Sequence, residues 1–277
     1  MTPALSVAHL TALDMAPQQW VSEAARAGFN AVGLRLNPTS ADAVSYPSRT
    51  GSAAHVALRR LLADQGVTVS DVEFIPVLPG IDIASFAPMF DAAADLGAQS
   101  VTVSGDDPDA ARLAASLASL SELAAGYGLR VDLEFMRWRH VGTLAQARAM
   151  LERVGSPNLA ILVDALHLAR SGGSPGDIRG LPPGTVRSAQ LCDAARVAPV
   201  GDEATIFEAR AGRLPPGAGA LPLAALLAAL PASTALSVEL PMPSLPTRER
   251  LDLAYRSTRA LLDAARCGAE PPGESRS

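Results

Sequence analysis

Short apolar segments alternate with longer, alanine-rich amphipathic segments eight times along this chain of 277 residues. Several of the apolar segments are apolar on both faces, as buried parallel strands are. Most neighbouring strand candidates lie 26 to 36 residues apart, which is enough for one helix between them. This alternation predicts a closed (β/α)8 barrel, in which each strand is followed by an outer helix. The predicted strands are 5–10, 31–36, 67–74, 100–104, 130–135, 159–164, 185–192 and 235–240, and the predicted helices are 17–27, 52–65, 84–96, 107–126, 143–154, roughly 174–180, 221–230 and 247–266.

The segments between these elements support a single barrel domain over residues 1–267. A doubly wound open sheet is the structural alternative, but no G-x-G-x-x-G follows the first strand. Asp107 and Pro108 are typical of a helix N-cap followed by proline at the first helical position. The segment 193–220, rich in arginine, glycine and proline, is predicted to be a long loop over the mouth of the barrel. The tail 268–277 is predicted to be disordered. Glycines expected at helix C-termini are Gly28, Gly66, Gly97, Gly128 and Gly155.

The charged composition excludes several classes of function. All 23 basic residues are arginine, so no Schiff-base lysine and no P-loop lysine is available. A net charge of −5 argues against broad binding to nucleic acid or to acidic membranes. The N-terminus lacks the pattern of a signal peptide, and the longest apolar stretch, 221–230, is half the ~20 residues of a membrane span. We therefore expect a soluble, cytoplasmic protein whose two cysteines build no disulfide framework.

Polar residues stand at the ends of the predicted strands, where a barrel of this type carries its active site. Glu134, Asp164 and Glu239 interrupt otherwise apolar strand segments, and a buried carboxylate is costly unless it is paired or bound to a cation. Together with Gln190 they form an oxygen-rich set on four consecutive strands, which suits Mg²⁺ or Mn²⁺ better than zinc. A lone strand-end glutamate is equally well explained by an ion pair with arginine, but four such residues are harder to explain in that way. The full set of polar residues at these ends is His9, Arg35, Glu73, Ser104, Glu134, Asp164 with His167, Gln190 and Glu239.

Five motifs in this order carry a resemblance that covers roughly residues 5 to 265. They are AARAGFNAVGLRL near the N-terminus, LEFM with Glu134, VDALH with Asp164 and His167, QLCD with Gln190, and VELP with Glu239. The segment PPGAGALPLAALLAAL at 215–230 adds to them. The chain resembles the sugar phosphate isomerase/epimerase family, the xylose-isomerase-like barrels. That family includes ketose 3-epimerases, hydroxypyruvate isomerase and certain sugar or shikimate-pathway dehydratases.

The resemblance implies a metal site and a type of chemistry. It implies that Glu134, Asp164, Gln190 and Glu239 bind one divalent ion, Mn²⁺ or Mg²⁺. Many epimerases have a histidine at the position of Gln190, whereas a glutamine also occurs in dehydratases of the family. In such enzymes the metal polarises a carbonyl, and Glu134 or Glu239 would take the acidified α-proton to give a metal-stabilised enediolate.

The resemblance also implies substrate contacts, and here the chain departs from both subclasses. His167 matches a histidine that binds a substrate hydroxyl, and Arg196 matches a substrate-contacting arginine, a role for which Arg210 and Arg213 compete. Dehydratases tend to have a histidine where this chain has Met136, and epimerases tend to have a second acidic residue where it has His140.

Further strand-end and loop residues have both a functional and a structural interpretation. His140 is a candidate substrate contact or an exposed loop residue, and Trp138 could stack on a substrate or pack against the rim. Glu73, His9 and Arg35 are candidate substrate contacts or members of a structural ion pair. His55, within the second predicted helix, is expected at the surface.

These observations favour an enzyme over the other classes. The first expectation is a metal-dependent isomerase or epimerase, the alternative is a dehydratase of the same family, and a non-catalytic auxiliary barrel is the third reading. The G-x-S-x-G match at 172–176 follows no strand and precedes no histidine, which excludes a hydrolase triad. Four histidines are too few for the histidine-rich cluster of the related apurinic endonucleases. The expected partner is a small-molecule substrate, with no nucleic acid and no membrane, and the outer helices are compatible with a homodimer.

Overall fold

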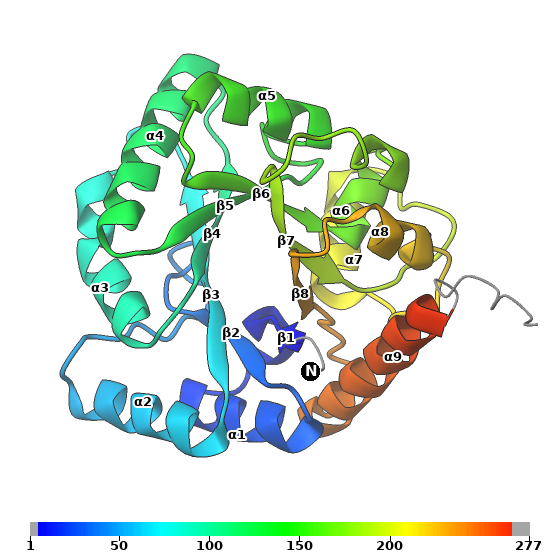
Figure 1. The fold of residues 1–277 in the computed structure, drawn as a ribbon, viewed down its shortest axis with the longest axis horizontal. Coiled ribbons are helices and arrows are strands. Elements are labelled where there is room, and N and C mark those ends of the chain that lie inside the picture. The colour runs from blue at the N-terminus through cyan, green and yellow to red at the C-terminus, as the bar shows by residue number, and fades with distance from the viewer. Residues whose placement is uncertain (1–4, 268–277) are drawn as a thin grey trace, which may run out of the picture.

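A computed structural model describes residues 5–267 of the chain. Its eight parallel strands form a closed barrel in chain order, and β1 closes the barrel by pairing with β8 (Figure 1). The (β/α)8 barrel and the single-domain organisation predicted from the sequence are confirmed. The strands are β1 (Leu5–Val7), β2 (Ala31–Arg35), β3 (Thr68–Val77), β4 (Ser100–Gly105), β5 (Arg130–Glu134), β6 (Leu159–Asp164), β7 (Val186–Leu191) and β8 (Ala235–Val238).

The helices form an outer ring around the strands (Figure 1). The α-helices are α1 (Pro17–Ala27), α2 (Ala53–Gln65), α3 (Ala87–Asp95), α4 (Ala110–Gly126), α5 (Leu144–Val154), α6 (Ala165–Arg170), α7 (Asp202–Ala211), α8 (Leu223–Ala229) and α9 (Thr247–Cys267). Three short 3-10 helices, η1 (His9–Ala12), η2 (Ile83–Phe86) and η3 (Pro175–Asp177), lie between them. The helices end as predicted: all five predicted glycines have positive φ, a conformation in which glycine carries no steric penalty.

The apolar core lies between the strands and the helices, whereas much of the barrel interior is polar. Successive side chains of a strand point to opposite faces. In β5, Val131 and Leu133 therefore pack into the apolar core, and Asp132 and Glu134 fall on the other face, inside the barrel. This departs from the usual barrel interior, which is filled by branched apolar side chains. The alternation of polar and apolar residues in β5 thus places a carboxylate at each of two depths inside the barrel.

Two helices follow strands without having been predicted. The six-residue α6 begins directly after β6. Asp164, the last residue of β6, is its N-cap, and the Asp164 side chain accepts a hydrogen bond from the backbone N–H of His167. The segment 193–220, predicted as a loop, contains α7. Only Thr205 and Ala209 of α7 are buried, so the helix lacks the apolar periodicity that would have identified it. Conversely, the helix predicted at 174–180 is reduced to η3.

Two further local predictions are wrong. The N-cap of α4 is Asp109, which accepts hydrogen bonds from the backbone N–H groups of Ala111 and Arg112, while Asp107 pairs with the Arg112 side chain. His55 is buried rather than at the surface, because Ser48 and Asp95 from neighbouring segments hydrogen-bond its two ring nitrogens at 2.8 Å each.

Two further expectations concern membrane-spanning segments and the C-terminal tail. Among the described helices, none combines the length and the apolar character that a membrane crossing requires. The tail predicted to be disordered, 268–277, lies outside the described residues.

Candidate functional site

A cavity of about 330 Å³ opens at the carboxyl ends of the strands. Glu134 is the last residue of β5, Asp164 is the last of β6, Gln190 lies in β7, and Glu239 directly follows β8. All four side chains are buried, and Glu134, Gln190 and Glu239 line the cavity. Asp164 is fully buried and is not among the residues that line the cavity. The structure therefore brings together, on four consecutive strands, the four residues predicted as metal ligands. The other lining residues include Leu10, Leu13, Arg35, Val44, Glu73, Phe74, Thr102, Met136, Trp138, Arg139, His167, Arg210 and Arg213.

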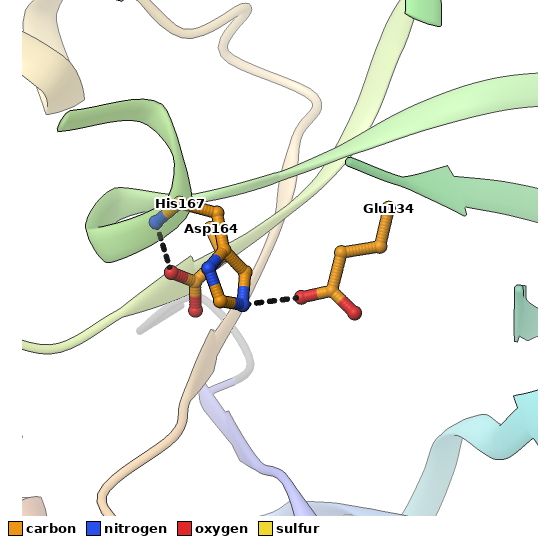
Figure 2. A group of neighbouring side chains, drawn as sticks. All are labelled: Glu134, Asp164 and His167. Carbon is orange, nitrogen blue, oxygen red and sulfur yellow. Dashed lines mark hydrogen bonds and ion pairs between the residues drawn. The ribbon is translucent and has the colours of Figure 1, made fainter. Parts of the chain in front are cut away.

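Glu134, Asp164 and His167 form the tightest group in the site (Figure 2). One potential ligand atom from each lies within 4.8 Å of the other two. The backbone N–H of His167 donates to Oδ1 of Asp164 at 2.9 Å, and Nε2 of His167 faces Oε1 of Glu134 at 3.6 Å. The Trp138 ring packs edge-on against His167 with ring centroids 5.1 Å apart, which fixes the orientation of the imidazole.

Arg213 is the one cation that contacts the predicted ligands in the described chain. Its Nη1 donates to Oδ2 of Asp164 at 2.5 Å, and its Nη2 donates to Oε2 of Glu239 at 2.6 Å. The side chain is buried, and its Nε donates to the carbonyl of Ala209 at the end of α7. The sequence analysis considered Arg213 for substrate contact, but its hydrogen bonds instead join it to the floor of the site.

The three carboxyl groups differ in how their charge is stabilised. Burial raises the pKa of Glu134 well above its usual range, and the nearby carboxylates of Glu239 and Asp164 raise it further. Burial likewise raises the pKa of Glu239 to about 8, although Arg213 partly opposes the shift. Burial would also raise the pKa of Asp164, but Arg213 and His167 outweigh it, so this pKa is lowered. Without a further cation, the site therefore favours the protonated forms of Glu134 and Glu239, and Arg213 balances the charge of Asp164.

Three residues that line the cavity have a buried side-chain atom without a hydrogen-bond partner among residues 5–267. These atoms are Oε1 of Gln190, Nδ1 of His167 and Nε of Arg139. Buried polar atoms are nearly always paired, so an orphaned acceptor beside uncompensated carboxylates indicates a missing ligand. When all three carboxyl groups are ionised, Arg213 leaves two net negative charges, which one divalent cation would cancel. The donor set of carboxylate and amide oxygens therefore fits a hard divalent ion.

The residues predicted on the first three strands form a separate, internally paired cluster. Arg35 donates from Nε and Nη2 to Oε2 of Glu73, at 2.9 and 2.6 Å. The backbone N–H of His9 donates to the other carboxylate oxygen of Glu73 at 3.0 Å. The His9 ring is stacked between Trp20 and Tyr46 and hydrogen-bonds backbone groups through both nitrogens. Arg35 and Glu73 line the cavity, whereas His9 is not among its lining residues.

Three loop residues are placed differently from one another. Arg196 is exposed in the segment after β7 and does not line the cavity. His140 is exposed too and lines a separate depression beside Asp107 and Met150. Arg210, near the end of α7, does line the cavity, and within the described chain its guanidinium has no carboxylate within ion-pairing distance. Only the folding of the unpredicted α7 brings Arg210 and Arg213 to the site, so spacing from Gln190 could not select between them and Arg196.

A larger cavity of about 620 Å³ opens at the opposite end of the barrel. Asp71, Arg130 and Ser188 are among its lining residues. Its polar groups are largely paired: Arg130 and Ser188 bond the carboxylate of Asp132, and Ser70 and Thr102 bond that of Asp71. The smaller cavity, with its unpaired donor set, is therefore the better candidate for the functional site.

Comparisons with known proteins identify the family of the chain. Residues 21–263 match the family model described as "Xylose isomerase-like TIM barrel". The chain is 32% identical over 244 residues to a 3-dehydroshikimate dehydratase of Pseudomonas aeruginosa, an alignment that covers 82% of this chain but 36% of that protein. It thus spans about a third of the length of this relative.

Solved structures resemble the chain at lower identity. A fusion protein of a xylose isomerase-like TIM barrel and a 4-hydroxyphenylpyruvate dioxygenase superimposes with a TM-score of 0.81 at 24% identity, covering 99% of this chain and 46% of the fusion protein. An L-ribulose 3-epimerase superimposes with a TM-score of 0.73 at 17% identity, and the match covers 100% of both chains. At these identities the likeness establishes the fold.

Proposed function

The chain belongs to the family of xylose isomerase-like TIM barrels, and on that premise we propose that it is a metal-dependent lyase that dehydrates a hydroxy-keto acid of the dehydroshikimate type. The observation that carries this proposal is the cavity itself. Its floor offers three carboxyl groups with one cation among them and the unpaired Oε1 of Gln190, and its wall offers Arg210, a guanidinium without a carboxylate partner in the described chain. The first feature supports enolate chemistry next to a carbonyl, and the second supports an anionic substrate.

We propose Glu134, Asp164, Gln190 and Glu239 as the ligands of one divalent ion, Mn²⁺ or Mg²⁺. The three carboxylates and the unpaired amide oxygen of Gln190 support this assignment. When bound, the ion supplies Lewis-acid polarisation of the substrate carbonyl, which acidifies the neighbouring carbon.

The protein's own groups would then handle the protons of the elimination. A carboxylate, Glu134 or Glu239, would accept the α-proton. The electron pair left on carbon forms the double bond as the bond to the β-hydroxyl breaks, and the protonated carboxyl group returns its proton to the leaving hydroxyl to give water. Burial lowers the pKa of His167 to about 4, so its imidazole is neutral and can hydrogen-bond a substrate hydroxyl. Its position beside Glu134 puts it within reach of a substrate seated on that carboxylate.

Arg210 supports the carboxylate on the substrate. Arg35, Arg139 and Arg210 all line the cavity. Arg210 is largely exposed, but its partial burial lowers its pKa, and the positive charges of Arg139 and Arg35 lower it further. Arg139 pairs with Asp106 and Arg35 pairs with Glu73, so among the described residues that line the cavity Arg210 is the guanidinium without a carboxylate partner. A carboxylate beside Arg210 would relieve this repulsion. The similarity to a 3-dehydroshikimate dehydratase, whose named substrate is an acid anion, points the same way.

An epimerase of the same family is the second candidate. Two carboxylates on different strands, Glu134 and Glu239, line the cavity, and such a pair can remove a proton from one face of a carbon and return it to the other. The likeness to an L-ribulose 3-epimerase is compatible with this reaction. The sequence alone placed isomerases first; the unpaired Arg210 and the curated relative favour the lyase.

A direct assay separates the two candidates. Chelated protein would be reloaded with Mn²⁺ or Mg²⁺ and incubated with 3-dehydroshikimate, and with a panel of ketoses in D₂O. If the protein is a lyase, we expect metal-dependent loss of one water molecule from the acid, measured by mass spectrometry. Deuterium uptake by a ketose without loss of water would favour the epimerase. No metal-dependent change in either assay would overturn both.

A further inference from the structure

Arg213 is held at the centre of the proposed ligand set by an unusually complete group of partners. Besides Asp164 and Glu239, its guanidinium contacts the carbonyl of Ala209 at 2.8 Å and the Sγ of Cys192 at 3.3 Å. The residue is only 2% exposed. Four of the five N–H bonds of a guanidinium are thereby directed at protein atoms, so Arg213 has little left with which to bind a substrate.

The guanidinium uses only one oxygen of each carboxylate. In Asp164 it takes Oδ2, while Oδ1 accepts from the backbone N–H of His167. In Glu239 it takes Oε2, and Oε1 accepts no hydrogen bond from the described residues. The carboxylate of Glu134 and the Oε1 of Gln190 are also without a short hydrogen bond there. Arg213 therefore holds two ligands in place and still leaves donor atoms of the set free.

We propose that Arg213 is a positioning residue of the metal centre: it fixes Asp164 and Glu239 by one oxygen each and makes the loaded site electrically neutral. This inference rests on the metal site proposed above. Three carboxylates, one guanidinium and one divalent ion sum to zero charge, and a buried site without net charge avoids the large desolvation cost of an isolated ion. Outer contacts of this kind orient metal ligands, and their loss commonly weakens metal binding about 10–100-fold.

The test is the affinity for Mn²⁺, measured by calorimetry without substrate. For Arg213→Met we expect the Kd of Mn²⁺ to rise about 10–100-fold. Arg213→Lys keeps the charge but cannot span both carboxylates with a planar fork, so we expect a rise of at least several-fold. This second variant tests the same contacts if Arg213→Met does not fold, because it retains a cation among the buried carboxylates.

Arg170→Met is the matched control. Arg170 makes a buried two-bond pair with Glu208, at 2.7 Å through Nε and through Nη2, and contacts none of the proposed ligands. We expect its Mn²⁺ affinity to equal that of the unmodified protein. Unchanged or tighter Mn²⁺ binding in both Arg213 variants would overturn the inference. Failure of the unmodified protein to bind Mn²⁺ would overturn the proposed metal site, so the two failures are distinguishable.

Discussion

The two ends of the barrel interior contain similar polar side chains but differ in how these are paired. At the amino end of the strands, the Asp132 carboxylate accepts hydrogen bonds from Arg130 at 2.7 and 2.8 Å and from Ser188 at 2.5 Å. At the carboxyl end, two strand positions later, Glu134 has only the 3.6 Å contact with His167 in the described chain. Asp132 and Glu134 lie on the same strand, but the Asp132 carboxylate is fully hydrogen-bonded whereas that of Glu134 has no short hydrogen bond in the described chain. A carboxylate with its own partners needs no ligand, whereas a buried one without them indicates a bound cation.

The mouth of the barrel divides in the same way around its circumference. On β2 and β3, Arg35 and Glu73 form an ion pair, so the charges of these two residues balance on this side of the mouth. On β5 to β8 the carboxylates outnumber their cation, Arg213. Pairing rather than burial therefore distinguishes the candidate metal centre from the rest of a polar barrel interior.

The largest effect is expected at the unpaired end. Glu134→Gln removes a proposed metal ligand and base while keeping the shape of the side chain. We expect kcat to fall about 10²–10⁴-fold, the range contributed by general acid–base groups. Elemental analysis should find less bound Mn²⁺ in the same preparation. Near-normal turnover with a full complement of metal would remove Glu134 from the site.

A substitution at the paired end should reduce stability and leave metal binding unchanged. Asp132→Ala leaves the Arg130 guanidinium without its carboxylate, so we expect the free energy of unfolding to fall by about 3 kcal/mol. We take the low end of the range for a broken buried pair, because 20% of the Arg130 side chain remains exposed. Urea denaturation measures the loss. The Mn²⁺ stoichiometry should not change, and loss of the metal without loss of stability would contradict the comparison.

The pH dependence of stability should separate the two ends in the metal-free protein. Burial raises the pKa of Glu239 to about 8 from an ordinary 4.5, so the folded state binds its proton more tightly than the unfolded state. The stabilisation is complete below about pH 4.5 and is lost as the pH rises through 8, a change on the order of a few kcal/mol. Burial similarly raises the pKa of Asp71 to about 7.

Thermal melting over this pH range provides the measurement. Glu239→Gln should reduce the fall in melting temperature between about pH 4.5 and 8, and so should Mn²⁺ added to the unmodified protein. Asp71→Asn should reduce only the part of the decline below about pH 7, and that part should persist when Mn²⁺ is present. A pH profile that Mn²⁺ leaves unaltered would contradict the assignment of Glu239 to the metal centre.

A smaller effect is expected at Arg210. Arg210→Met should raise KM for a carboxylate-bearing substrate about 10–100-fold, since a hydrogen bond to a charged group contributes roughly 1.5–3 kcal/mol. Arg187→Met is the matched control, because Arg187 lines the cavity at the opposite end of the barrel. Equal KM values for the two variants would remove the argument for an anionic substrate.

The smallest effect is expected at His140. This histidine is exposed and lines a depression outside the cavity, so His140→Ala should leave kcat within about twofold of the unmodified enzyme, as is usual for surface substitutions. Steady-state assays with 3-dehydroshikimate, the substrate of the proposed reaction, would measure it. A fall of tenfold or more would mean that the loop after β5 reorganises over the substrate.

Sequence reasoning was most successful where the signal is local. The eight strands could be located because β-branched and leucine-rich segments between helix caps depend on near neighbours in the chain. The positions of Glu134, Asp164, Gln190 and Glu239 followed from the same pattern, since strand ends of a parallel barrel converge at one face. His55 was misjudged because its environment comes from distant segments, and α7 was missed because it lacks apolar periodicity. Asp95, 40 residues away in the chain, is what makes the burial of His55 favourable.

The sequence by itself determined the barrel and the four strand-end residues, because side-chain alternation and strand order leave few other arrangements. Only the tertiary structure decided how those residues are paired. Arg213 lies 49 residues from Asp164 and 26 from Glu239, and no spacing rule selects it over the chain's other arginines. The physical reason is that the charge on a buried carboxylate is set by whichever group the fold brings within hydrogen-bonding distance, and that distance is a property of packing rather than of sequence.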